Sequence, residues 1–256
     1  MGHKRFYDLH RNYTLRTPLE YFISPGIRCK FDLLKENIGS KRNFFRGLDL
    51  GCSGNSFLLF LDNLETKCVY DIADLPLEQY KNRPNFHPLC GDMTHLPYRD
   101  NSFDFITALD VLEHIKSDEI AVSEISRILK TNGMIVLTVP HRMKFFTEQD
   151  RLIGHYRRYE LEQIDALFNK YDLKRIRTFG VYGRLMRIAD FQATDPDKTE
   201  DGIEKLREKY RNDSKFRAFW NCIMKISSKV MKLDAKYHSN DKIMNIGFIF
   251  RKEEIS

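Results

Sequence analysis

The sequence lacks the features of a disulfide-stabilised, zinc-binding or membrane-spanning protein. Its five cysteines are odd in number and widely spaced, and none stands in a Cys-x-x-Cys pair, which argues against disulfides and zinc sites. No run approaches the about 18 apolar residues that a transmembrane helix needs, and no charged-then-apolar signal segment opens the chain. We therefore expect free thiols, a cytoplasmic location and no bound metal.

Acidic residues are scarce in one segment, and this scarcity accounts for the net charge of +6. Residues 203–236 hold ten Lys or Arg and four Asp or Glu, so their excess of six equals that of the whole chain. A basic excess confined to one segment indicates a local surface with its own partner or solvent exposure, and it says nothing about the fold.

Strand and helix patterns alternate between residues 46 and 180. Predicted strands cover Leu48–Leu50, Lys67–Asp71, Phe86–Cys90, Phe103–Leu109, Met134–Val139 and Leu173–Phe179, with a last strand at Ile243–Arg251. Predicted helices cover Phe57–Leu61, Leu75–Tyr80 and Leu161–Tyr171, and another runs from Ser117 to an end at Asn132–Gly133. This alternation predicts an α/β fold, a doubly wound, mostly parallel seven-stranded Rossmann-like sheet with helices on both faces.

Two segments stand outside this alternation. Residues 1–45 are aromatic and basic and predict a helix from Pro18 to Glu36, interrupted at Pro25. Some sixty residues separate the sixth strand from the last, which is long for a connection within a sheet. We therefore divide the chain into an N-terminal helical lid (1–45), a core (46–180), an inserted helical basic cap (181–242) and the last strand with a tail (243–256).

The segment Phe45–Ser56 is the most informative part of the chain. It predicts a buried strand that runs into a glycine-bearing turn and then a helix, so that the backbone can approach a ligand closely. Four further pieces follow in order: Asp71 at the end of a strand, then Gly91–Met93, Asn101–Asp104 and Asp110–His114.

In this order the pieces resemble the class I S-adenosylmethionine-dependent methyltransferases, and most closely those with the type 11 methyltransferase domain, over roughly residues 45–180. The resemblance implies S-adenosylmethionine as cofactor and a seventh strand that is antiparallel. It implies that Asp71 binds the ribose, that Asp92 meets the adenine amino group and that Met93 packs on the ring. The candidate cofactor-binding residues are Asp49, Gly51, Ser53, Asn55, Asp71, Ile72, Asp92, Met93, Asp110 and Val111.

The turn departs from the family pattern Asp-x-Gly-x-Gly-x-Gly, because Ser53 and Asn55 replace its second and third glycines. Both residues tolerate tight turns, and Asn accepts a positive φ readily, so we expect cofactor binding with an altered turn. Two alternatives remain. A nicotinamide-dependent oxidoreductase would need a full Gly-x-Gly-x-x-Gly turn, which the chain lacks, whereas a non-catalytic binding module that keeps the fold would explain the irregular turn.

The acceptor is less well defined, because methyl transfer from a sulfonium depends largely on alignment and needs a base only for some nucleophiles. His155 and His114 are the candidate catalytic residues. Candidate substrate contacts are Tyr13, Arg157, Arg158 and Tyr159. Alternatively, Asp150 pairs with one of these arginines and the segment only fixes its loop. The acceptor itself is expected to be a small molecule or a lipid precursor, methylated at O, N or C.

Apolar residues recur at helical spacing over residues 216–233, with basic and polar residues on the opposite face. Two interpretations stay open: the helix lies on an anionic membrane and admits a lipid-linked substrate, or its apolar face simply closes the pocket. Nucleic acid is an unlikely partner, because the chain has no recognisable RNA-binding module and no Asn-Pro-Pro-Tyr signature.

Overall fold

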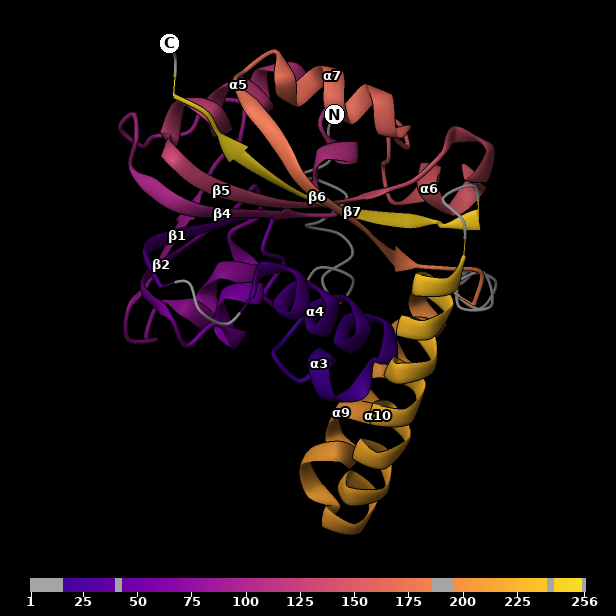
Figure 1. The fold of residues 1–256 in the computed structure, drawn as a ribbon. Coiled ribbons are helices and arrows are strands. Elements are labelled where there is room, and N and C mark those ends of the chain that lie inside the picture. The colour runs from indigo at the N-terminus through magenta and orange to yellow at the C-terminus, as the bar shows by residue number, and fades with distance from the viewer. Residues whose placement is uncertain (1–15, 40–42, 186–195, 239–241, 255–256) are drawn as a thin grey trace.

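The computed structural model describes residues 16–39, 43–185, 196–238 and 242–254. Its centre is a seven-stranded sheet in the order β3-β2-β1-β4-β5-β7-β6 (Figure 1). The strands are β1 (Phe44–Leu50), β2 (Leu64–Asp71), β3 (Phe86–Cys90), β4 (Phe103–Leu109), β5 (Leu129–Pro140), β6 (Leu173–Tyr182) and β7 (Asn245–Lys252). The strands from β1 to β5 pair in parallel, and β7 lies antiparallel between β5 and β6. The predicted fold class and the antiparallel last strand are confirmed.

Helices cover both faces of this sheet (Figure 1). The helices α5 (Asp118–Ile128) and α7 (Leu161–Asn169) pack on one face, and α3 (Glu20–Ile23) and α4 (Pro25–Ile38) lie on the other. Alternate residues of the central strands point to opposite sides, and both sets are buried. Strands buried on both faces need continuous apolar runs, and this is why β4 and β5 were recognisable in the sequence.

Several of the connecting elements are short, and most of them are 3₁₀ helices, which are wound more tightly than α-helices. The predicted helices after the first two strands are 3₁₀ turns, η1 (Phe57–Phe60) and η2 (Leu75–Tyr80). Three more short elements are η3 (Leu112–His114), η4 (Met143–Phe145) and α6 (Glu148–Leu152). The element after the first turn is therefore a short 3₁₀ helix, whose start is capped by the Ser56 side chain accepting a hydrogen bond from the amide of Leu58, and not an α-helix.

The end of α5 also differs from the prediction. The helix ends at Ile128, and β5 begins at Leu129, before the expected stop at Asn132–Gly133. The reason is tertiary: Leu129 already pairs with Phe103 of β4. Asn132 then takes a φ of +64° within the strand segment, so the turn signal marks an irregularity of β5 and not the end of a helix.

The described part of the predicted cap consists of two helices, α9 (Pro196–Asn212) and α10 (Ser214–Tyr237), which together project from the body of the molecule (Figure 1). They pack against α3 and α4. Arg207 of α9 and Glu20 of α3 form a buried ion pair, in which Nε of the arginine lies 2.8 Å from the carboxylate. Of the predicted lid, α3 and α4 are described, whereas Tyr13 lies outside the described residues.

Most of the apolar stripe of α10 faces solvent. Phe219, Ile226, Val230 and Leu233 are between 48% and 61% exposed and Tyr237 is 82% exposed, whereas Phe216, Trp220 and Ile223 are half-buried. The expectation that this face closes the pocket is wrong, because no described residue of α10 lines the cavity at the strand ends. The helix instead turns a face with Met224, Ser228 and Ala235 toward the body, where the small side chains of Ser228 and Ala235 allow a close approach. Among the described helices, none is both long and apolar enough to cross a bilayer.

Candidate active site

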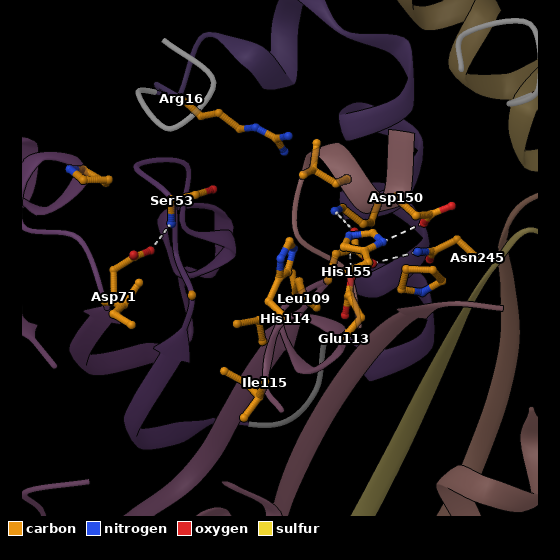
Figure 2. Close-up of a pocket in the computed structure, with 18 of the residues that line it drawn as sticks. Arg16, Ser53, Asp71, Leu109, Glu113, His114, Ile115, Asp150, His155 and Asn245 are labelled. Carbon is orange, nitrogen blue, oxygen red and sulfur yellow. Dashed lines mark hydrogen bonds and ion pairs between the residues drawn. The ribbon is translucent and has the colours of Figure 1, made fainter. Parts of the chain in front are cut away.

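A cavity of about 990 Å³ lies at the carboxyl ends of β1, β2 and β4, where ligands of open α/β sheets bind. Its floor is formed by the strand ends, and its walls include residues of α3, α4 and α9. The volume is at the upper end of the roughly 300–1,000 Å³ typical of small-molecule pockets. Figure 2 shows Ser53 and Asp71 at one end, and Glu113, Asp150 and His155 at the other.

The turn after β1 is left-handed at three positions. Gly51 has a φ of +68°, Ser53 of +40° and Gly54 of +80°. At Gly51 a side chain would also collide with Val111, because a Cβ would lie 2.5 Å from its Cγ2. Of the two residues that replace glycines of the family pattern, Ser53 takes a positive φ and Asn55 does not. Asn55 is buried and does not line the cavity, whereas Gly51, Ser53 and Val111 do.

Asp49 connects the turn after β1 to the neighbouring strand through hydrogen bonds. Its two carboxylate oxygens accept hydrogen bonds from the hydroxyls of Ser56 and Thr107, each at 2.6 Å. Burial raises the pKa of Asp49 to about 6, against the effect of these hydroxyl donors. Asp49 is absent from the residues that line the cavity, so its observed contacts connect β1, β4 and the turn.

Asp71, at the end of β2, faces the cavity. One of its oxygens accepts a hydrogen bond from the backbone amide of Ser53 (2.9 Å) and the other from that of Ala73 (3.1 Å). Burial raises the pKa of Asp71, although these amide donors oppose the shift. Each oxygen keeps a lone pair for a ligand, as binding of a ribose diol would require. Ile72 lines the cavity beside it.

The turn after β3 supplies the second acid. Asp92 is exposed and lines the cavity, and one of its oxygens accepts a hydrogen bond from the amide of Thr94 at 2.8 Å. Met93 is buried and also lines the cavity. Because β2 and β3 are neighbours, Asp71 and Asp92 lie at the same edge of the sheet, as the resemblance implies.

Asp110 directly follows β4, has a φ of +53° and connects three parts of the chain. Its carboxylate lies 2.7 Å from Nζ of Lys30 on α4 and accepts hydrogen bonds from Thr138 (2.9 Å) and Asn245 (2.7 Å). Burial opposes the charge, but attraction to Lys30 and the three hydrogen bonds outweigh it and hold the pKa near about 2. The cavity rim is thereby fastened to the N-terminal helices.

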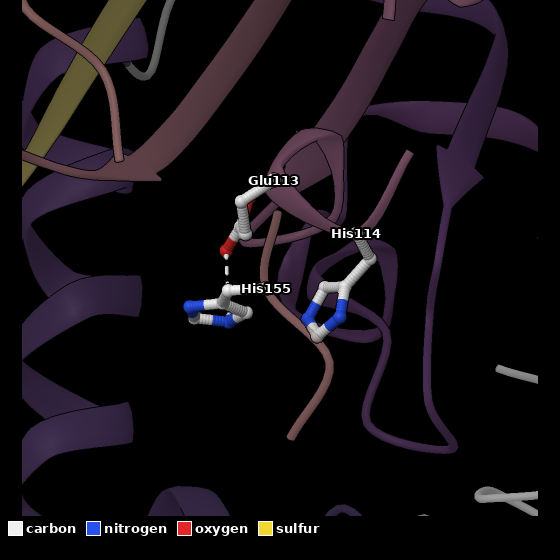
Figure 3. Close-up of side chains that lie close together, drawn as sticks. All are labelled: Glu113, His114 and His155. Carbon is white, nitrogen blue, oxygen red and sulfur yellow. Dashed lines mark ion pairs between the residues drawn. The ribbon is translucent and has the colours of Figure 1, made fainter. Parts of the chain in front are cut away.

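A polar cluster forms the far wall (Figure 3). Glu113 and His114 come from η3, and His155 comes from the loop after α6. Nδ1 of His155 lies 2.6 Å from Asp150, and its Nε2 lies 3.7 Å from Glu113. Glu113 is completely buried, and burial raises the pKa of its carboxyl well above the usual range. The two expected catalytic histidines are thus in edge-to-face contact at the cavity.

The expected substrate contacts are divided between the cavity wall and its support. Arg158 lines the cavity, but its guanidinium binds Asp150 at 2.7 Å. Arg157 pairs with Asp118 at 2.6 Å, and the Tyr159 hydroxyl donates to the same carboxylate at 2.8 Å. Neither Arg157 nor Tyr159 lines the cavity. These contacts agree with the alternative in which the segment fixes its own loop, with His155 the member that faces the ligand space.

The structure brings further residues to the cavity that the sequence analysis did not select. The charged and polar ones among them include Arg16, Lys30, Glu113, Asp150, Arg207 and Asn245. Two carried a local signal, because Glu113 precedes His114 and Asp150 was considered as an arginine partner. The others come from the lid, the cap and the last strand, and no local pattern marks them.

Residues 48–137 match a family described as methyltransferase domain. The chain contains a class I S-adenosylmethionine-dependent methyltransferase domain. It is 41% identical to demethylmenaquinone methyltransferase of Staphylococcus haemolyticus over 66 residues, which are 26% of this chain and 28% of that one. It is 31% identical to a human mitochondrial arginine hydroxylase over 120 residues, 42% and 34% of the two chains.

Among solved structures, the methyltransferase domain shares its fold with phosphoethanolamine N-methyltransferase 2 of Haemonchus contortus in complex with S-adenosylmethionine. The TM-score is 0.62 at 18% identity, over 99% of this chain and 60% of that one. The chain spans about half or less of the length of the curated relatives it matches. Those relatives carry different activities, so the family does not by itself fix the acceptor.

Proposed function

We propose that this protein transfers a methyl group from S-adenosylmethionine to a small molecule or lipid precursor by in-line displacement. The observation that carries the proposal is the continuity of the cavity. One end has the turn and acids expected for the cofactor, the other end has the polar wall of Glu113, His114 and His155, and the volume suffices for two ligands.

The residues at the first end fit the cofactor. The left-handed turn exposes backbone groups without a Cβ at Gly51, Asp71 keeps free lone pairs, and the Asp92 carboxylate is open to a donor. When bound, the cofactor supplies a methyl group already activated by its sulfonium. The nicotinamide alternative finds no support, since the family match is to methyltransferases.

The chain itself then contributes alignment and exclusion of water. Residues of α3, α4 and α9 wall the cavity, and the buried Glu20–Arg207 ion pair holds α9 against α3. The acceptor would lie between these helices and the polar wall, so its nucleophilic atom faces the methyl group. Fixing two reactants in this way removes much of the entropic part of the barrier.

Calorimetry with S-adenosylmethionine and, separately, with a nicotinamide dinucleotide tests the cofactor. We expect one-to-one binding of the former and none of the latter. Incubation with methyl-labelled cofactor and a metabolite extract then tests catalysis, with a labelled product as the expected result. Cofactor binding without any labelled product would favour the non-catalytic binding module, and dinucleotide binding would overturn the proposal.

The exposed stripe of α10 favours a second element of function. We propose that this helix lies on an anionic membrane surface, through which a lipid-linked acceptor reaches the cavity. The stripe is apolar over five turns, and exposed Lys225, Lys229 and Lys236 flank it. This combination is typical of interfacial helices, and the positive charge complements an anionic headgroup.

Vesicle flotation tests the membrane contact. The wild type should float with vesicles that contain anionic lipid and not with neutral vesicles, and added salt should release it. Ile226→Asp should abolish flotation, whereas Ile176→Asp, at an exposed apolar position on β6, should not. Absence of salt-sensitive flotation, or a solution dimer that Ile226→Asp dissociates, would overturn the proposal.

A further inference from the structure

The geometry points to a divalent transition-metal site made by Glu113, His114 and His155 on the acceptor side of the cavity. One carboxylate oxygen and one nitrogen of each imidazole lie within 4.8 Å of one another. The three side chains lie close together and come from two segments of the chain (Figure 3). The role given to the metal rests on the proposed function, but metal binding itself can be measured without any activity.

Glu113 supplies the first independent indication. Its side chain is completely buried, and neither carboxylate oxygen has a hydrogen-bond partner among the described residues. Buried carboxylates are almost always paired, hydrogen-bonded or bound to a cation, because an uncompensated one costs several kcal/mol. The neighbour of Glu113 is Nε2 of His155 at 3.7 Å, which is too long for a hydrogen bond. A cation between the two groups would satisfy both.

His155 supplies the second indication. Its Nδ1 lies 2.6 Å from Asp150, so the Nδ1 proton is donated to that carboxylate and the Nε2 lone pair is directed toward Glu113. Asp150 is in turn fixed by the guanidinium of Arg158 at 2.7 Å. Metal-ligating histidines characteristically donate their other ring N–H to a carboxylate, and this fixes both the tautomer and the ring orientation.

The distances require only a small closure. A metal at about 2.1 Å from three tetrahedral ligands draws their atoms to about 3.4 Å from one another, compared with 3.7 Å for Glu113 and His155 and at most 4.8 Å for any pair. Small rotations of the three side chains would bring their ligand atoms to this separation. Two imidazoles and one carboxylate suit zinc, cobalt, manganese or iron as divalent ions, and such a set leaves positions open.

The open positions face the cavity, and this assigns a class of acceptor. A hydroxyl oxygen bound to the ion would lose its proton to solvent near neutral pH, because a divalent metal lowers the pKa of a bound hydroxyl. A lone pair of this oxygen then forms the new C–O bond while the methyl–sulfur bond breaks. The electron pair of the broken bond stays on sulfur. The site therefore favours O-methylation of a hydroxyl-bearing acceptor.

Titration of the chelator-treated protein with Co²⁺ tests the site, by calorimetry and by the visible absorption of the ion. We expect one Co²⁺ per chain, with affinity at least tenfold lower in Glu113→Gln and in His155→Gln. His87→Gln, at an exposed position on β3 outside the cavity, is the matched control and should bind as the wild type does. Circular dichroism and cofactor calorimetry on each variant report whether it is folded.

Asp150→Asn should weaken Co²⁺ binding about 10- to 100-fold through its effect on His155. The metal site would be overturned if the wild type failed to bind Co²⁺ stoichiometrically. It would also be overturned if Glu113→Gln and His155→Gln bound Co²⁺ with the same affinity as the wild type. If S-adenosylmethionine still binds in that case, the proposed function stands without the ion. If Co²⁺ binds and S-adenosylmethionine does not, the proposed function fails and the metal site remains.

Discussion

The carboxylate of Asp71 accepts a hydrogen bond from the backbone amide of Ser53, with 2.9 Å between the two atoms. The bond connects the end of β2 to the turn after β1, and both residues line the cavity. One acid therefore both shapes the irregular turn and faces the ligand. The bond also fixes the backbone of Ser53, which has a φ of +40°, within the turn.

Removing this acid should weaken cofactor binding. We expect Asp71→Ala to lower the affinity for S-adenosylmethionine by about 1–3 kcal/mol, or about 5- to 150-fold, since hydrogen bonds to the ribose and to Ser53 are both lost. Calorimetry measures the change. Glu65→Ala, at an exposed position on the same strand, serves as control, and an equal loss in both variants would contradict a ribose-binding role.

Gly51→Ala should impair both folding and binding. The φ of +68° and a Cβ only 2.5 Å from Val111 Cγ2 predict a destabilisation of about 1–3 kcal/mol, with loss of cofactor affinity beyond tenfold. Gly202→Ala on α9 is the matched control, because its Cβ meets open space and alanine favours a helix by about 1 kcal/mol. Urea unfolding should therefore give a lower free energy of unfolding than the wild type for Gly51→Ala and a higher one for Gly202→Ala.

The Glu20–Arg207 ion pair should be strongly coupled. Removing Arg207 alone leaves a buried carboxylate without its partner, so Arg207→Met is expected to cost about 3–5 kcal/mol of unfolding free energy. Glu20→Gln combined with Arg207→Met should cost less than the sum of the two single changes, as a double-mutant cycle measures. Strict additivity would mean that α9 is held to α3 by other contacts.

Asp110 should make part of the free energy of unfolding sensitive to acid. Its pKa of about 2 in the folded state is below the ordinary 3.8, so its contribution is present above about pH 4 and is lost as the pH falls toward 2. The difference corresponds to about 2 kcal/mol. Urea unfolding between these values should show a shallower pH dependence in Asp110→Asn.

Lys30→Met provides the complementary test of this pair. Without the ammonium 2.7 Å away, the pKa of Asp110 should rise toward its ordinary value, and carboxylate NMR titration would record the shift. An unchanged pKa of Asp110 in the variant would mean that Thr138 and Asn245 alone stabilise its charge.

The sheet could be predicted because its strands are marked locally. The apolar run Phe103–Leu109 has the predicted bounds of β4, and Phe86–Cys90 those of β3. Ends set by tertiary pairing could not be predicted in this way: Leu129 joins β5 because Phe103 is its partner, despite the helical pattern that precedes it. The order of the cofactor motifs likewise indicated which strand ends meet.

The far wall of the cavity was only partly foreseen. His155 and His114 were selected for their chemistry, but Lys30 and Asn245 reach Asp110 from 80 and 135 residues away, and no spacing rule connects them. Of the two interpretations of α10, the one in which its apolar face closes the pocket is wrong, because most of that face is exposed. The small residues Ser228 and Ala235, which allow close packing on the body, were the better guide.

The position of β7 has a consequence for how the chain is made. Among the strands of this sheet, β7 comes last in the sequence, yet it lies inside the sheet, between β5 and β6. Until residue 252 has been synthesised, β5 and β6 each have an edge without the partner strand β7. The helices that precede β7 in the sequence must leave the space between these two strands open. The sheet therefore cannot close before β7 is available, and a chain stalled within α10 would leave β5 and β6 with unpaired edges that could pair with other strands.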